Sequence, residues 1–187
     1  MRTVDQIAIR APVDRVFEVA ADVERWPEIL SHYRWVRFLE RRDGGGLVEM
    51  AAWRPFGPLR YPTWWVSEMT VDRRAGEVRY RHVRGITRGM DVVWRLVPQA
   101  EAWARRDAVL KDSALQRSAS PSPPFRVGIN GAVPTDGVLV TIVHEWPGPA
   151  WPLVGALAAD LVIGPVFIHG IASRTLAGIK RFAEGVK

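Results

Sequence analysis

The stretch Ile7-Ala-Ile-Arg-Ala-Pro-Val-Asp-Arg-Val-Phe-Glu-Val-Ala-Ala-Asp-Val-Glu-Arg-Trp-Pro-Glu-Ile-Leu30 decides the fold of this chain. Ile7 and Ile9 alternate with other side chains, as in a half-buried strand. Pro12 stands where the first turn of a helix tolerates a missing N–H, and an apolar stripe at helical spacing follows it: Val13, Val16, Phe17 and Ala20. Asp22 is a candidate cap for a second short helix that contains Trp26-Pro27. A strand followed at once by two short helices indicates a sheet that is closed at one end, and we expect Trp26-Pro27 near a cavity mouth.

These residues resemble the opening of a known superfamily. Ala11-Pro-Val-Asp-Arg-Val-Phe17 followed by Trp26-Pro27 is similar to the START/SRPBCC (birch-pollen-allergen-like) superfamily, within it most of all to the polyketide cyclase/dehydrase-like branch. The end of the chain, Val166 to Glu184, resembles the long closing helix of that family. The resemblance covers most of the chain except about residues 99–136 and implies a fold. It does not decide the chemistry, because the superfamily includes carriers, cyclases, hydrolases and stress proteins.

The composition is that of one globular domain. A chain of 187 residues is long enough for a substantial core, so we expect a single START/SRPBCC-like domain over residues 1–187. The chain has no cysteine, which excludes disulfides and thiolate chemistry. Residues 1–6 lack the apolar core of a signal peptide. The longest apolar run, residues 153–168, is interrupted and too short to span a membrane. We therefore expect a soluble, cytoplasmic protein.

The net charge of +6 raises the question of a nucleic-acid partner. The chain has 23 arginines and only 3 lysines. The arginines are spread along the predicted strands and alternate with apolar residues, as in Val78-Arg-Tyr-Arg-His82, which is typical of the outer faces of strands. We therefore expect no nucleic-acid partner and no stable membrane insertion. Weak contact with an anionic membrane is compatible with the charge.

The middle of the chain is a run of strands. A hairpin around Asp43-Gly-Gly-Gly46 is predicted to join strands 33–42 and 47–54. Further strands are predicted over residues 59–72, 77–84, 90–97 and 137–146, and a closing helical region over about 151–184, broken or kinked at Gly164-Pro165. The fold class is therefore α+β. We expect a helix-grip fold, with about seven antiparallel strands wrapped around a long C-terminal helix and two short helices after the first strand.

Residues 99–136 interrupt this pattern between the last two strands. Residues 100–115 have helical character, and residues 116–124 are rich in serine and proline, which favours an extended or mobile segment. A connection of this length in a compact domain is either functional or disordered. We interpret it as an inserted, flexible excursion, with a lid or partner-binding arm as the alternative.

Strand alternation predicts which side chains face a cavity between sheet and helix. Inward positions include Trp65, Ser67 and Met69 of one strand, Tyr80 and His82 of the next, and then Trp94, Ile142, His144 and Trp146. Aromatic residues commonly fill protein cores. Together, Trp65, Trp94 and Trp146 with Tyr80 would also form an aromatic wall for a flat hydrophobic ligand. Their polar neighbours in such a pocket are expected to be Ser67, Arg54 and, one helical turn apart, His169 and Ser173.

His144 and His82 are the candidate catalytic residues. A partly buried imidazole exchanges protons near neutral pH, although a histidine in such a place is also compatible with a purely structural role. His32 is expected to be exposed at the cavity mouth. The four histidines lack metal-ligand spacing, no nucleophile elbow occurs, and no dinucleotide fingerprint occurs, so we expect no metal and no cofactor.

Three functions fit these features. The first is a module that binds a hydrophobic small molecule (polyketide-, aromatic- or lipid-like) in the internal cavity. The second is an aromatase/cyclase that promotes aldol cyclisation and dehydration of a polyketide, which the family resemblance implies and for which His144, His82, Arg54 and Tyr80 are candidates. The third is an interaction module that uses residues 99–136.

Overall fold

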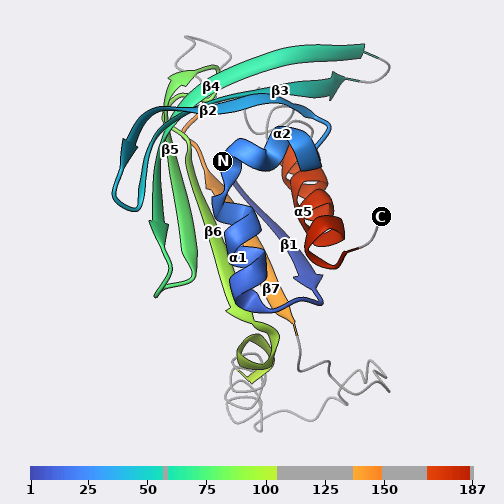
Figure 1. The fold of residues 1–187 in the computed structure, drawn as a ribbon. Coiled ribbons are helices and arrows are strands. Elements are labelled where there is room, and N and C mark those ends of the chain that lie inside the picture. The colour runs from blue at the N-terminus through green and yellow to red at the C-terminus, as the bar shows by residue number, and fades with distance from the viewer. Residues whose placement is uncertain (57–58, 105–136, 149–167, 186–187) are drawn as a thin grey trace, which may run out of the picture.

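The computed structural model describes residues 1–56, 59–104, 137–148 and 168–185. Its main feature is a curved, antiparallel seven-stranded sheet in the order β1-β7-β6-β5-β4-β3-β2 (Figure 1). The first strand along the chain thus pairs with the last. The strands are β1 (Arg2–Ile9), β2 (Tyr33–Arg42), β3 (Gly45–Phe56), β4 (Leu59–Asp72), β5 (Glu77–Gly85), β6 (Asp91–Pro98) and β7 (Val138–Glu145).

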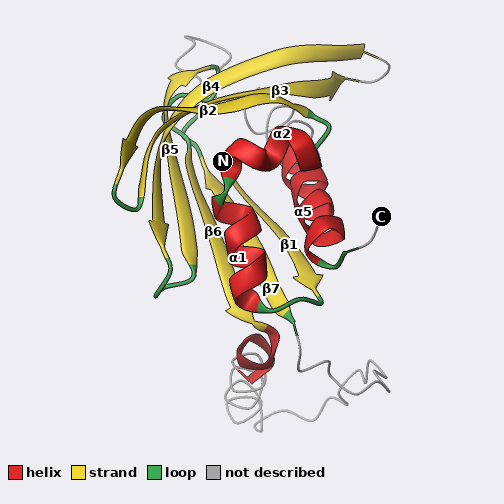
Figure 2. Ribbon diagram, viewed as in Figure 1, coloured by secondary structure: helices red, strands yellow, loops and turns green. Residues whose placement is uncertain are grey.

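The helices lie on the concave face of the sheet. They are α1 (Val13–Ala21), the 3-10 turn η1 (Val23–Arg25), α2 (Trp26–Ile29) and the closing helix α5 (His169–Ala183). Figure 2 shows α1, α2 and α5 grouped together, with the sheet curving around them. None of the described helices is long and apolar enough to cross a membrane.

The core lies between the sheet and these helices. The apolar stripe of α1 buries Val16, Phe17 and Ala20, and α5 buries Leu176 and Ile179. The inner positions of the central strands are filled with large side chains, because every second residue of a strand points to the same face. Val78, Trp94, Leu96, Val140 and Ile142 are each at most 4% exposed.

The helix-grip α+β fold that the sequence predicts is confirmed, and most strand boundaries agree to within two residues. Of the helical region expected over 151–184, the structure describes α5, and the expected break at Gly164-Pro165 lies outside the described residues. The first strand is longer than Ile7 and Ile9 suggest, because the whole segment from Arg2 to Ile9 pairs with β7. Asp22 is the residue before η1, but its side chain makes no capping hydrogen bond. Strand β6 ends at Pro98 and β7 begins at Val138. A helix over residues 99–104 follows β6 directly, and residues 105–136 lie outside the described residues.

One glycine fixes the position of a central aromatic side chain. Gly85 ends β5 opposite Trp65 with φ of 95°, a conformation that other residues rarely adopt. A Cβ atom at Gly85 would collide with the carbonyl oxygen of Trp64. The close approach of β5 at this point accompanies a bulge between Val66 and Ser67, and Trp65 faces inward beside it.

Candidate functional site

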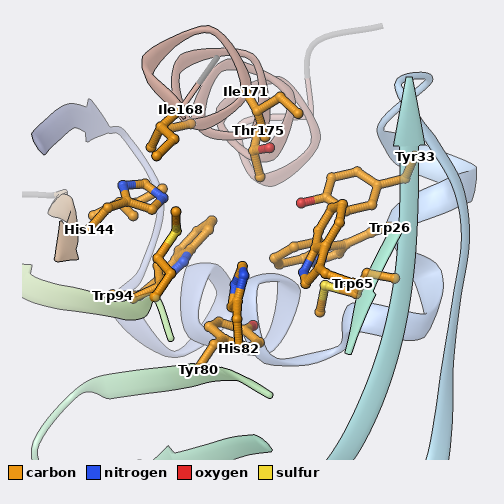
Figure 3. Close-up of a pocket in the computed structure, with 15 residues that line it drawn as sticks. Trp26, Tyr33, Trp65, Tyr80, His82, Trp94, His144, Ile168, Ile171 and Thr175 are labelled. Atoms are coloured by element: carbon orange, nitrogen blue, oxygen red, sulfur yellow. The ribbon is translucent and has the colours of Figure 1, made fainter. Parts of the chain in front are cut away.

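A pocket opens between the inner face of the sheet and the N-terminal part of α5 (Figure 3). The atom-free space between its lining residues is about 540 Å³, including space open to solvent, and about 60 Å³ can hold the centre of a water-sized molecule. Water molecules therefore fit into the pocket in this conformation, whereas a larger ligand has to displace lining side chains. The lining residues are Trp26, Tyr33, Met50, Trp65, Tyr80, His82, Met90, Val92, Trp94, Ile142, His144, Ile168, Ile171, Ala172 and Thr175.

Aromatic rings form a continuous chain around this pocket. The Trp26 ring lies 5.5 Å from Trp94 and 5.1 Å from Tyr33, measured between centroids. Tyr33 in turn lies 6.2 Å from Trp65, whose ring stacks on His82 at 5.9 Å with an interplanar angle of 15°. Rings at these distances attract each other beyond the effect of area burial. The pocket thus has a firm, flat-sided apolar wall.

Two histidines give this apolar pocket its proton-exchanging groups. Nδ1 of His82 lies 2.6 Å from Oγ1 of Thr87, and Nδ1 of His144 lies 3.2 Å from Oγ1 of Thr3. A threonine hydroxyl thus holds Nδ1 of each ring. If Nδ1 donates to the hydroxyl, Nε2 has a lone pair and is a base; if Nδ1 accepts, Nε2 carries the proton. Each imidazole can therefore act as either acid or base.

Tyr80 adds a third polar group. Its side chain is buried, and its hydroxyl has no hydrogen-bond partner in the described part of the chain. Burial, with a smaller effect of nearby Tyr33, raises the pKa of Tyr80 well above 10, so the phenol stays protonated. Unpartnered buried hydroxyls are costly and rare. This one is suited to donate a hydrogen bond to a ligand oxygen.

The structure brings together six of the residues singled out in the sequence. Trp65, Tyr80, His82, Trp94, Ile142 and His144 all line the pocket. Ser67 and Met69 face inward and are buried, but they are not among the residues that line the pocket. The Ser67 hydroxyl also has no partner among the described residues. Trp146 is buried at the end of β7, where its indole N–H donates to the Arg88 carbonyl oxygen at 3.0 Å.

The helix residues expected in the pocket lie beside it. The His169 ring contacts the buried carboxylate of Asp5 on β1, and the His169 side chain is 63% exposed. The Ser173 hydroxyl donates to the His169 carbonyl oxygen at 2.7 Å. The face of α5 that meets the pocket is made instead by Ile168, Ile171, Ala172 and Thr175, because these positions form the buried stripe of the helix. The side chain of Arg54 lies outside what the structure describes.

His32 is not exposed at a mouth, contrary to expectation. It is half-buried, its Nε2 lies 3.0 Å from Oγ1 of Thr175, and its ring lies 4.8 Å from that of Tyr33. Trp26 is only 2% exposed, so it is a wall residue rather than a residue at the opening. Its indole N–H donates to the Val19 carbonyl oxygen at 3.0 Å, which fixes the ring in place.

Several pocket residues were not singled out in the sequence as site residues. Tyr33 begins β2 directly after the loop, and Thr175 lies inside an apolar helix stripe, so neither carries a local signal. Within the described ranges, no group of three or more histidine, aspartate or glutamate side chains is placed to hold a metal ion.

The fold and the pocket define a START-like helix-grip protein whose cavity is lined by aromatic rings. The chain belongs to the polyketide cyclase/dehydrase and lipid transport family, whose model matches residues 9–161.

Three relatives illustrate the likeness. A Streptomyces cyaneus protein, "Putative polyketide cyclase", is 37% identical over 94 residues, which are 49% of this chain and 60% of that protein. The chain thus spans less than two thirds of this curated relative. The crystal structure of the Zhui aromatase/cyclase from Streptomyces sp. R1128 has a TM-score of 0.67 at 16% identity, covering 98% of this chain and 93% of the other. A START superfamily protein from Mycobacterium smegmatis has a TM-score of 0.59 at 10% identity, covering 100% and 99%. At these identities, the two structures establish the fold alone.

Proposed function

We propose that this protein binds a hydrophobic, ring-containing small molecule of the polyketide, aromatic or lipid-like kind between the sheet and α5. The observation that carries the proposal is the chain of rings from Trp94 through Trp26 and Tyr33 to Trp65. Flat apolar walls with a few polar groups are the common design of small-molecule sites. Membership of the polyketide cyclase/dehydrase and lipid transport family supports the same ligand class.

The lining also accounts for how such a ligand would be oriented. The apolar body contacts the rings and Met50, while an oxygen of the ligand accepts a hydrogen bond from the buried Tyr80 hydroxyl. Pairing that hydroxyl removes an unsatisfied buried group, which favours ligands with a carbonyl or hydroxyl on their ring system.

Binding can be tested by calorimetry with three probes: a hydroxyanthraquinone, dodecanol and a sterol. Ala172 lines the pocket from α5 and is 3% exposed, so Ala172→Leu should fill the pocket and weaken the tightest probe by at least about tenfold. Ala75→Leu is the matched control, because Ala75 lies outside the pocket in the exposed turn between β4 and β5. Circular dichroism verifies that both variants fold. Absence of saturable binding for all three probes would overturn the proposal.

A second candidate function, polyketide cyclisation, is favoured by the two threonine-held histidines. In this reaction one imidazole takes a proton from the carbon between two carbonyl groups of the substrate. The resulting enolate carbon bonds to a distant carbonyl carbon, whose oxygen receives a proton from the other imidazole, in its protonated form, while Tyr80 donates a hydrogen bond to it. A second proton loss from the ring carbon then expels that hydroxyl as water, with the proton supplied by the imidazolium formed in the first step. Enolisation of the remaining ring carbonyl groups makes the ring aromatic. Each step is acid–base chemistry within the reach of imidazole and phenol groups.

Cyclisation can be tested with a poly-β-keto substrate mimic, followed by the absorbance of the aromatic product. His144→Gln and His82→Gln should each lower the rate by about 100-fold, the usual contribution of a positioned acid or base, while the affinity for a product analogue changes far less. Ser173→Ala is the control, because its hydroxyl lies outside the pocket and donates to a backbone carbonyl oxygen within α5. If the wild-type protein binds the analogue but produces no aromatic product above the uncatalysed rate, the binding proposal stands and cyclisation is rejected.

A further inference from the structure

A second depression lies on the far side of the His32–Thr175 contact. It is formed by the loop after α2, the β3–β4 hairpin and the outward face of α5, and its atom-free space, including space open to solvent, is about 790 Å³. We call it the arginine groove. Its lining residues are Leu30, Ser31, His32, Trp53, Arg60, Arg174, Ala177 and Arg181. Figure 1 shows the three segments meeting at one end of the molecule.

Helical spacing explains how α5 contributes to the groove. Arg174, Ala177 and Arg181 are three and four residues apart, so they share one face of the helix. The two arginines are exposed, and the small side chain of Ala177 between them leaves room for a ligand. Arg60, from the start of β4, adds a third guanidinium to the groove.

The ionisable side chains that line the groove are all basic. The groove is lined by three arginines and one histidine, and by no aspartate or glutamate from the described residues. Within the part of the chain that the structure describes, none of these three guanidiniums forms an ion pair with a carboxylate.

Arginines elsewhere on the surface differ in whether they have carboxylate partners. Eight described arginines form ion pairs within 4.0 Å: Arg2, Arg25, Arg37, Arg41, Arg42, Arg79, Arg81 and Arg95. Other described arginines, among them Arg84 and Arg88, form no ion pair with a described carboxylate. What distinguishes the groove is that three such guanidiniums line one depression. Like charges held close together repel each other, and an anion between them relieves that repulsion.

We propose that the arginine groove binds an oxyanion, the carboxylate or phosphate group of a small molecule. Planar guanidinium groups match the paired oxygens of carboxylate and phosphate in a bidentate manner. The hydroxyl of Ser31 and the indole of Trp53 stand in the same groove as further contacts. Such a group exists either as a free anion or as the charged end of a larger ligand.

The position of the groove favours the charged end of a larger ligand. His32 lines the groove, Thr175 lines the aromatic pocket, and the two side chains are hydrogen-bonded at 3.0 Å. The two spaces thus adjoin each other at this contact. This part of the inference rests on the proposed function: one molecule would place its apolar body in the pocket and its oxyanion among the arginines.

Nuclear magnetic resonance titrations test the groove by itself, with inorganic phosphate as the probe and sodium chloride at equal ionic strength as the reference. Phosphate should shift the Trp53 indole and Ser31 amide signals saturably. Arg174→Gln and Arg181→Gln should each raise the Kd at least about tenfold, because a hydrogen bond between charged groups is lost. Arg84→Gln removes one exposed arginine of β5 as the matched control. A non-saturable response, or an equal loss in Arg84→Gln, would reject the site.

A second titration identifies the source of the oxyanion by comparing dodecyl phosphate with dodecanol and with inorganic phosphate. Tighter binding of dodecyl phosphate than of either simpler probe, lost in Arg181→Gln, supports the bridging ligand. Equal binding of dodecyl phosphate and phosphate assigns the groove to a free anion and rejects bridging. If dodecanol and dodecyl phosphate leave the pocket signals unchanged while phosphate binds, the pocket proposal fails and the groove stands.

Discussion

Nε2 of His32 lies 3.0 Å from Oγ1 of Thr175, and this contact ties the loop after α2 to the closing helix. Thr175 is 1% exposed and lines the aromatic pocket, whereas His32 is half-buried and lines the arginine groove. This hydrogen bond therefore joins the loop after α2 to α5, and it lies where the aromatic pocket and the arginine groove adjoin each other.

Replacing Thr175 with valine tests the contribution of this contact. Valine has nearly the same shape, so the change removes the hydroxyl and leaves the packing intact. We expect a loss of about 1 kcal/mol in the free energy of unfolding, the usual net value of one hydrogen bond. For a chain of this length, that corresponds to a fall in Tm of about 2–4 °C. Ser173→Ala is the control, and a Tm that falls equally in both variants would contradict the argument.

Replacing each of two glycines in α5 with alanine tests how closely this helix packs against the loop after α2. A Cβ atom at Gly178 would collide with the side chain of Leu30, which is itself 2% exposed. At Gly170 an added Cβ meets nothing within 4 Å. Gly178→Ala should therefore destabilise the protein by about 1–2 kcal/mol through overpacking, while Gly170→Ala should be neutral or stabilise it by up to about 1 kcal/mol. Urea unfolding measures both, and opposite signs are the expected result.

The pocket residues on strands could be predicted from sequence because strand alternation is a local property. Once Trp65 is placed inside, Ser67 and Met69 follow, and the same logic holds for Tyr80 with His82. The structure places all of them on the inner face. Alternation does not predict which of the inward-facing residues along a strand reach the pocket. Ser67 and Met69 share the face of Trp65 but do not line the pocket.

The helix and loop contributions were harder to predict. His169 and Ser173 do share a side of α5, but the side that meets the sheet is set by Ile171, Ala172 and Thr175. The spacing of two polar residues in a helix shows that they share a side, but it does not show whether that side faces the pocket. The arginine groove combines residues near 31, 60 and 174–181, and only the folded chain brings these segments together.

The buried carboxylate of Glu49 makes part of the stability depend on pH. The indole N–H of Trp64 donates to it at 2.7 Å and Arg37 pairs with it, and together they lower the pKa of Glu49 despite its burial. A lowered pKa in the folded state means that the stabilisation is complete above the unfolded value near 4.5 and is lost as the pH falls through the folded value. Glu49→Gln should cost about 1–2 kcal/mol at pH 7 and much less at pH 3. Glu40→Gln is the exposed control, for which Tm should change far less at both pH values.

Asp5 should show the opposite pH dependence. Its carboxylate faces inward on β1 and is buried, and burial raises its pKa even though His169 beside it acts in the other direction. For an acid with a raised pKa, the folded state binds the proton more tightly than the unfolded state. Stability is therefore fully present below the unfolded value near 3.8 and decreases as the pH rises through the folded value.

Asp5→Asn removes this titration while keeping the shape of the side chain. We expect the variant to equal the wild-type protein in Tm near pH 3.5 and to exceed it at pH 7, by about 2–4 °C for each kcal/mol that the buried charge costs. His169→Asn is the complementary change. It leaves the charge of Asp5 without its partner and should lower the Tm at pH 7. A lower Tm of Asp5→Asn at pH 7 would show instead that the ion pair outweighs the burial of the carboxylate.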